Sequence, residues 1–527
     1  MTLSAPRRAP ARTDRLLAAA GGLVAGYVSL AVADLASFWV RPEASPVTAV
    51  GGAVVDRTPA AVKEWAIRQF GESDKAVLQL GILLLLGALA AAVGLLALRH
   101  RLLGAAALGV FGLLGALAAL TRPDSESALD AVPSLAGAAV GAALLYALTG
   151  ILTRRAGTGP AAARADRRTF LVAASAGLAA TAAAAVARAV GSPVEENAAA
   201  SRAALRLPRP ASPAPAVPPG AQLPVPGISP FVTPNRDFYR VDTALVVPRV
   251  DAGRWRLRVH GSGVREELTV TLPELMTRRI VERDVTLACV SNEVGGPYVG
   301  NARWLGVSLA DLLREAGVRP PSEGGPADQL VARSVDGMTI GTPVEQVMDG
   351  RDALLAFGMN GEPLPFTHGF PVRMVVPGLY GYVSACKWIT SIELTTFAAY
   401  DAYWVPRGWA ARAPVKTESR IDTPRPLARV APGTVAVAGV AWAQHRGIRR
   451  VEVRIDDGPW QDAELGAEDS DDTWRQWLHR WQAVPGRHTL TVRATDGTGA
   501  PQPEERTGTM PDGAQGWHSV VVEVDDA

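Results

Sequence analysis

The sequence predicts a multi-domain protein in which an α-helical transmembrane bundle is followed by an α+β domain and then by an all-β domain. Residues 1–190 are dominated by Ala, Leu, Gly and Val and contain long stretches without charge. The sequence after Pro230 instead alternates short apolar runs with turn residues, which is typical of strands. At 527 residues the chain is also too long for one ordinary domain, so we expect three or four units.

Five apolar segments in the first part of the chain are each about as long as a helix that crosses the hydrocarbon core of a bilayer. They lie near residues 15–36, 76–98, 102–121, 131–153 and 169–190. We therefore predict a membrane domain over residues 1–190 with about five transmembrane helices and the lipid bilayer as a partner.

Arginine residues orient these helices. They gather before the first segment, between the second and third (Arg99 and Arg101), and between the fourth and fifth (154–168). Under the positive-inside rule these ends are cytoplasmic, so the chain after residue 190 is expected on the extracytoplasmic side.

A twin-arginine-like sequence, Asp-Arg-Arg-Thr-Phe-Leu, stands at residues 166–171 just before the fifth segment. Such signals direct the export of proteins that have already folded. An ordinary arginine pair before a membrane helix is the alternative interpretation. If the signal is used, the exported domain must fold, and bind any cofactor it needs, in the cytoplasm.

Residues 191–230 are rich in Pro, Ala and Ser. This composition predicts an extended, semi-rigid linker between the membrane domain and the rest of the chain. We expect no core within it.

Cys289 is the most informative residue of the next domain, which we place at residues 231–411. It follows an apolar, strand-like run and precedes a Gly-rich turn, and only one other cysteine, Cys386, is present. A thiolate at a strand end can ligate a soft metal ion, whereas a free cysteine is more often a small buried apolar residue.

Three clusters of hydrogen-bond donors stand beside Gly or Pro turns, at residues 233–240, 366–373 and 380–388. Arginine can hold a phosphate through two parallel bonds and lysine supplies a compact charge, so the clusters indicate a site for an anionic ligand. A formal net charge of only +2 argues against nucleic acid as a partner.

Several long motifs together resemble the sulfite oxidase family of molybdopterin enzymes. They are the run around Cys289, Asn-Ala-Arg-Trp-Leu-Gly-Val at 301–307, Met-Asn-Gly-Glu-Pro-Leu-Pro at 359–365, His-Gly-Phe-Pro-Val-Arg at 368–373 and Ser-Ala-Cys-Lys-Trp at 384–388. The resemblance covers roughly residues 230–525. It implies a molybdopterin cofactor with molybdenum and oxygen-atom transfer on a small substrate.

The resemblance also assigns roles to individual residues. Cys289 would ligate molybdenum, and Tyr403 falls near the family's active-site tyrosine. Residues that match the cofactor-binding segments are Asn235, Arg236, Phe238, Tyr239, Cys289, Asp336, His368, Arg373, Ser384 and Lys387. Cys386 is interpreted as a packed small residue. Glu293-Val294 stand where animal and plant sulfite oxidases have arginines, and a carboxylate there would disfavour sulfite as the substrate.

Residues 412–527 predict a second, all-β domain, with strands such as 434–442 and 448–455 separated by turn residues. The resemblance implies an immunoglobulin-like dimerisation domain and hence a homodimer. Three tryptophans, Trp474, Trp477 and Trp481, could form a stacking platform for a ligand, but packing in a core or interface is the favoured interpretation.

Electrons must come from or go to a separate carrier. The chain has no Cys-x-x-Cys-His haem motif, and His100 is the one histidine of residues 1–190. We expect a cytochrome or a membrane quinone system. Two alternatives stay open: a sulfoxide reductase with the same cofactor, and a non-enzymatic tethered interaction module.

Overall fold

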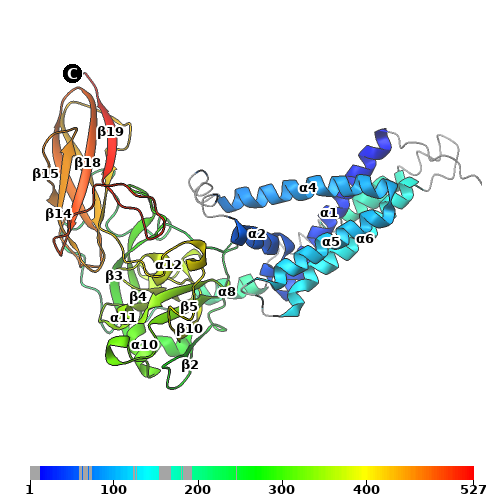
Figure 1. Ribbon diagram of the computed structural model, residues 1–527, viewed down its shortest axis with the longest axis horizontal. Coiled ribbons are helices and arrows are strands. Elements are labelled where there is room, and N and C mark those ends of the chain that lie inside the picture. Colours follow the sequence, from blue (N-terminus) through cyan, green and yellow to red (C-terminus); the bar gives the residue numbers. More distant parts are fainter. Residues whose placement is uncertain are drawn as a thin grey trace, which may run out of the picture. The chain divides into compact units, whose positions relative to one another are not determined.

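The computed structural model describes residues 12–58, 62, 69, 74–122, 125, 127–153, 168–179, 181, 193–244 and 246–526. The chain divides into two units (Figure 1). The first comprises Met1–Glu196 with Ala244–Val246, and the second comprises Asn197–Thr243 with Val247–Ala527. The first unit is helical, and the second is built mainly from β-sheets.

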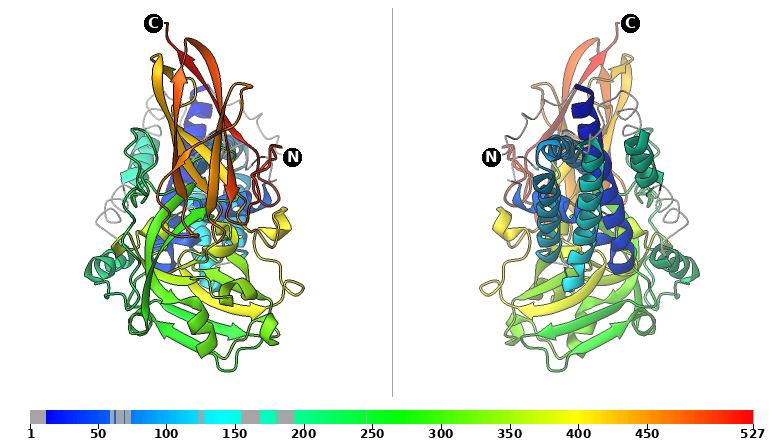
Figure 2. Two further views of the ribbon diagram at one scale, coloured as in Figure 1. Left: turned by 90° about the vertical axis from the view of Figure 1, so that its left-hand side faces the viewer. Right: turned by 90° about the vertical axis from the view of Figure 1, so that its right-hand side faces the viewer.

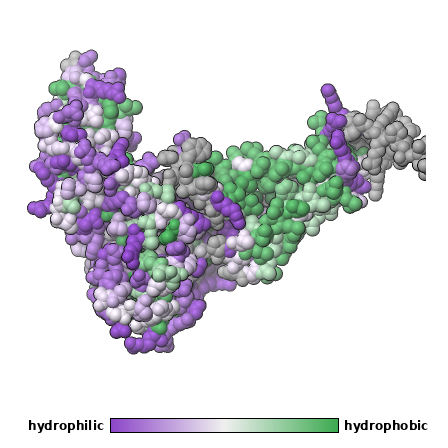
Figure 3. Space-filling model, in the orientation of Figure 1, coloured by the Kyte–Doolittle hydropathy of each residue, from purple (hydrophilic) through white to green (hydrophobic). Residues whose placement is uncertain are grey.

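Among its described residues, the helical unit contains four helices that are long and apolar enough to cross a membrane. The spans are Arg12–Val40 in α1, Val77–Arg99 in α4 (Asp74–Arg99), Arg101–Leu120 in α5, and Ala128–Thr153, which covers η3 (Ala128–Ala131) and α6 (Val132–Thr153). Their apolar side chains gather on the surface of this unit (Figure 3). These four agree with four of the five predicted segments.

The fifth predicted segment is described only in part, as a shorter apolar helix over Arg168–Ala179. Residues 182–192 at its predicted end, and Asp166 and Arg167 of the twin-arginine-like sequence, lie outside the described residues. Between the first two predicted segments lies a helix that the sequence did not indicate, α2 (Pro46–Arg57).

Small residues let the membrane-type helices approach closely. A Cβ on Gly22 of α1 would overlap the backbone of Ala90 and Gly94 of α4, and a Cβ on Gly137 of α6 would overlap the carbonyl of Ser29 in α1. Such contacts are a main source of helix association in lipid, where burial of apolar surface gives little driving force.

The second unit begins with a mixed α+β domain, as predicted. One sheet has the order β2-β1-β10-β5-β6 and the other β3-β4-β7-β8, with β9 paired to β7. The strands are β1 (Arg256–Gly261), β2 (Leu268–Thr271), β3 (Ile280–Ala288), β4 (Val299–Ser308), β5 (Gln329–Ser334), β6 (Thr339–Pro343), β7 (Leu354–Met359), β8 (Glu362–Pro363), β9 (Arg373–Val375) and β10 (Ile389–Thr395).

Short helices connect these strands. They are α9 (Leu272–Met276), α10 (Leu309–Glu315), α11 (Val344–Met348) and α12 (Gly381–Ser384). Ser308 caps α10 by accepting a hydrogen bond from the backbone N–H of Asp311 at 3.1 Å. Trp304 and Phe357 are fully buried between the elements and anchor the core.

The last part of the chain forms two sheets that share one apolar core (Figure 2, orange to red). The first holds β11 (Glu418–Thr423), β13 (Gly433–Trp442), β16 (Glu464–Leu465) and β17 (Arg475–Ala483). The second holds β12 (Arg429–Val430), β14 (Ile448–Ile455), β15 (Gln461–Asp462), β18 (Gly486–Asp496) and β19 (His518–Val524). The tryptophans Trp474, Trp477 and Trp481 are all buried, as core packing predicts.

The segment predicted as a linker differs from that expectation. After α8 (Pro193–Ala204), the chain runs along the second unit: the N–H of Ala211 donates to the carbonyl of Ile280 at 2.8 Å, and Ser212 forms a β-bridge with Val281. Ala221 and Leu223 are buried. Apolar side chains between the prolines give the segment a face that can be buried, although the composition as a whole is that of a spacer.

Candidate functional site

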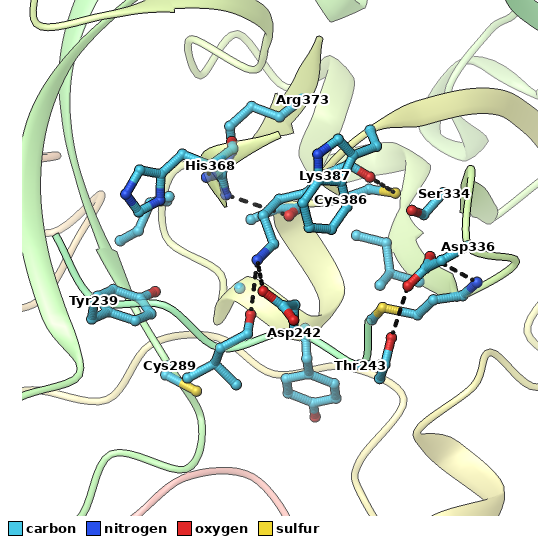
Figure 4. A pocket seen from close by; sticks show the side chains of 18 of the residues that line it. Tyr239, Asp242, Thr243, Cys289, Ser334, Asp336, His368, Arg373, Cys386 and Lys387 are labelled. Atoms are coloured by element: carbon cyan, nitrogen blue, oxygen red, sulfur yellow. Dashed lines mark hydrogen bonds and ion pairs between the residues drawn. The ribbon is translucent and has the colours of Figure 1, made fainter. Parts of the chain in front are cut away.

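A cavity in the second unit collects side chains from distant parts of the α+β domain (Figure 4). Its empty space, counted together with the solvent open to it, amounts to about 770 Å³. Seven of the predicted cofactor-binding residues line it: Phe238, Tyr239, Cys289, Asp336, His368, Arg373 and Lys387.

Cys289 enters the cavity from the end of β3. Its backbone N–H donates to the carbonyl of Tyr298 at 2.9 Å, which extends the β3–β4 pairing by one residue. The residue is 8% exposed, and its Sγ lies 2.9 Å from the Oγ of Ser291. Burial raises the pKa of the Cys289 thiol, while Ser291 and the charge of Lys387 act in the opposite direction. A bound cation would therefore favour the thiolate.

Arg373 of β9 gives the cavity a buried positive charge. Its guanidinium lies 4.9 Å from the ring centroid of Trp304, and one nitrogen donates to the carbonyl of His368 at 3.3 Å. Burial lowers the pKa of Arg373 to about 10, so the group remains charged at neutral pH.

His368 ends a short 3-10 helix, η5 (Phe366–His368), and its Nε2 lies 3.0 Å from the carbonyl of Asn235. Burial, followed by the charge of Arg373, lowers the pKa of His368 to about 4. The imidazole is therefore neutral at pH 7. Because a carbonyl only accepts, Nε2 carries the proton and Nδ1 is left as an acceptor.

Lys387 follows α12 and already holds an anionic group. Its Nζ lies 2.8 Å from a carboxylate oxygen of Asp242 and donates to the carbonyl of Val241 at 3.2 Å. The same Asp242 oxygen accepts from Nε of Arg240 at 2.9 Å. Nearby, Asp336 accepts from the hydroxyl of Thr243 at 3.2 Å.

Four predicted residues are not among the described residues that line the cavity. Asn235 acts through its carbonyl on His368 and through its amide, which donates to Glu362 at 2.7 Å. The side chain of Arg236 is 86% exposed and pairs with Asp237. Ser384 is buried and donates to carbonyls of the turn that opens α12.

Tyr403 is the fourth. Its ring packs at 5.0 Å against that of Trp404, and the guanidinium of Arg407 lies 3.6 Å from the Tyr403 ring centroid. Trp404, its neighbour in sequence, lines the cavity instead.

Sequence reasoning missed several residues of the cavity wall. Asp242, Thr243, Tyr382 and Trp404 line it, and Cys386, which we expected to be a packed residue, is buried and lines it too. Glu293 is exposed and is not found among the described lining residues, so the structure gives no sign of the predicted charge conflict inside the cavity.

The donor set fits a molybdopterin. Such a cofactor presents a metal that binds thiolate, a pterin edge with N–H groups and a terminal phosphate. The cavity offers the thiol of Cys289, the carboxylate acceptors Asp242 and Asp336, and the cations Arg373 and Lys387.

Comparison with known proteins agrees with this chemistry. Residues 244–404 match a family model described as the oxidoreductase molybdopterin binding domain. Mitochondrial sulfite oxidase of Mus musculus is 30% identical over 343 residues, which are 56% of this chain and 62% of that protein. Sulfite oxidase of Gallus gallus is 33% identical over 276 residues, which are 45% and 59% of the two chains.

The chain thus spans about three fifths of the length of these relatives. Among solved structures, the sulfane dehydrogenase SoxCD from Paracoccus pantotrophus shows a TM-score of 0.48 at 24% identity, covering 56% of this chain and 84% of that one.

The cavity and the family match define a molybdopterin-binding oxidoreductase domain, and the cofactor is molybdopterin with molybdenum. Over the matched residues the chain is similar to the sulfite oxidase family of molybdopterin-dependent oxidoreductases.

Proposed function

We propose that the chain is a membrane-anchored oxidoreductase that performs oxygen-atom transfer on a small substrate, in the manner of sulfite oxidase, on the extracytoplasmic side. The observation that carries the proposal is the position of Cys289: a buried thiol at a strand end, in a cavity that also holds Arg373 and Lys387. This is the arrangement that a thiolate-ligated metal with an anionic organic group requires.

When bound, the cofactor supplies two-electron redox chemistry and carries the oxygen atom. The protein residues do the rest. Cys289 would hold the metal, Arg373 and Lys387 would hold the anionic end, and Asp336 would accept hydrogen bonds from the pterin edge. His368 is neutral and offers its Nδ1 as an acceptor. Burial raises the pKa of Tyr239, so its hydroxyl stays protonated and can donate.

The membrane anchor is supported by the four long apolar helices and by the arginines at their ends. With those ends in the cytoplasm, a crossing by the fifth predicted segment, residues 169–190, would carry the part that contains Cys289 to the other side of the membrane. The two sheets after residue 412 would form the immunoglobulin-like domain through which a homodimer assembles. A separate cytochrome or quinone system would exchange electrons with the site.

Metal analysis of the full-length protein in detergent tests the proposal. The chain would be expressed in a host that makes molybdopterin, as wild type, Cys289→Ser and Cys386→Ser. Both cysteines are buried and line the cavity, so Cys386→Ser is a matched control. We expect near-stoichiometric molybdenum in wild type and in Cys386→Ser, with the same visible spectrum, and a changed spectrum in Cys289→Ser.

If both variants gave the same spectrum, Cys289 would not be a ligand of the metal. No molybdenum in wild type, despite an adequate cofactor supply, would instead favour the non-enzymatic interaction module. With metal present, sulfite with a one-electron acceptor and methionine sulfoxide with a reduced viologen dye distinguish the oxidase from the reductase.

A further inference from the structure

The loop that carries Cys289 is closed at its base by its own hydrogen bonds. The N–H of Asn292 donates to the carbonyl of Cys289 at 3.1 Å, and the side-chain oxygen of Asn292 accepts from the N–H of Tyr298 at 2.7 Å. The tip of the loop, Gly295 and Gly296, contacts residues of the all-β domain. The position of the loop therefore depends on two domains.

Arg420 of β11 holds one side of the tip. One guanidinium nitrogen donates to the carbonyl of Gly296 at 2.8 Å, and the other donates to the hydroxyl of Ser229 at 2.9 Å. Nε donates to Asp422 at 2.6 Å, and the two side chains are 11% and 7% exposed. A planar guanidinium with all three nitrogens engaged fixes the direction of each bond, which a lysine could not do.

His518 of β19 holds the other side. Its Nδ1 accepts from the backbone N–H of Ile421 at 3.0 Å, which fixes the ring on the edge of β11. A Cβ on Gly295 would overlap this imidazole, so the ring lies directly against the backbone of the loop. Gly295 also has a φ of +79°, a conformation that favours glycine.

We propose that Arg420 and His518 are positioning residues for Cys289. By gripping Gly295 and Gly296, the all-β domain holds the loop closed and directs the thiol into the cavity. That domain would then help to form the metal site, in addition to any role in forming a homodimer. The inference rests on the proposed function, because it gives the thiol its metal partner.

The test is the rate at which iodoacetamide alkylates Cys289 and Cys386 in full-length, cofactor-free protein, followed by mass spectrometry. Both thiols are buried and line the same cavity, so Cys386 reports any general opening of the domain. In Arg420→Met we expect alkylation of Cys289 to rise roughly tenfold or more relative to Cys386, since a charged hydrogen bond to the loop is lost.

Arg446→Met is the matched control. Arg446 also lies in the all-β domain and also forms an ion pair, but its bonds go to Asp496, Val415 and Thr417. We expect it to leave the ratio of the two alkylation rates unchanged.

A second pair of variants covers the case in which Arg420→Met does not fold. Gly295→Ala places a Cβ against His518, whereas at Gly324, with a similar φ of +77°, a Cβ would meet no described atom within 4 Å. We expect Gly295→Ala, and not Gly324→Ala, to raise the alkylation of Cys289 alone.

Equal increases at both cysteines, or no increase at Cys289, would overturn the proposal. The experiment uses cofactor-free protein, so its result does not depend on the metal analysis. If wild type bound no molybdenum, the proposed function would be refuted, but the two alkylation rates could still be compared. In metal-loaded Arg420→Met we further expect an altered visible spectrum at unchanged metal content.

Discussion

The ammonium group of Lys387 lies 2.8 Å from the carboxylate of Asp242, whose side chain is only 2% exposed. Arg240 contacts the same carboxylate oxygen. The cation expected to hold the anionic end of the cofactor is therefore balanced by a buried acid of the protein itself. The two residues stand 145 positions apart in the chain.

Asp242→Asn should destabilise the cofactor-free protein more than the loaded one. The substitution keeps the shape of the side chain but leaves Lys387 and Arg240 without this negative charge. Removing one partner of a buried ion pair costs about 3–5 kcal/mol. A bound anionic cofactor would replace part of that charge. Thermal unfolding of both forms, each compared with wild type, measures the difference; equal losses would contradict the prediction.

Asp469→Asn should stabilise the protein at neutral pH. Burial, and then the nearby carboxylate of Asp284, raise the pKa of Asp469 to about 6. An acid with a raised pKa binds its proton more tightly in the folded state, so stability falls as pH rises from about 4 to about 6 and stays lower above that. Because the group is only partly buried, we expect a gain of only about 1 kcal/mol at pH 7.

Urea denaturation of wild type and Asp469→Asn at pH 7 and at pH 4 checks this. The two proteins should differ at pH 7 and converge at pH 4, where the native acid is protonated in the folded state. A constant difference at both pH values would mean that the substitution acts through packing.

Gly94→Val should loosen the helical unit. The backbone of Gly94 contacts that of Gly22 in α1, and a Cβ on Gly94 would overlap the carbonyl of Ala18. Overpacking of this kind costs about 1–3 kcal/mol. Gly81 lies on the same helix, and a Cβ there would meet no described atom within 4 Å, so Gly81→Val is the control. Thermal unfolding in detergent should separate the two variants.

Substitutions at Trp404 and Tyr403 should have different effects on cofactor content. Trp404 lines the cavity. Tyr403 packs against the ring of Trp404, and the guanidinium of Arg407 lies over the Tyr403 ring. We expect Trp404→Ala to lower molybdenum content several-fold and Tyr403→Phe to leave it unchanged. Elemental analysis decides this. If Tyr403→Phe then shows reduced turnover, it supports the role in the active site that the family resemblance implies.

Local signals allowed much of the fold to be predicted. Helix α10 (Leu309–Glu315) is marked in the sequence itself, because the Ser308 cap and the glycine that follows the helix are both encoded nearby. The strand that delivers Cys289 was equally visible as an apolar run. Helix α2 was missed because its twelve residues lack a strong apolar period within a stretch of mixed charge.

The cavity was only partly predictable. The motifs that resemble the family could be matched residue by residue. Asp242 could not be predicted, because it belongs to the cavity wall through an ion pair with the distant Lys387, which no local sequence pattern indicates. The same holds for Arg420 and His518, which reach the Cys289 loop from another domain.

The Pro-rich segment before residue 230 has a practical consequence for cleavage. Its composition is that of a protease-sensitive hinge, yet it is fastened along the second unit: Arg202 donates to the carbonyls of Pro363 and Leu364, and the N–H of Leu223 donates to Gln476. Backbone bound in this way resists proteases, which prefer exposed loop tips. Trimming the chain at residue 231 would strip away buried Ala221 and Leu223, so a fragment that is released intact should begin near Asn197.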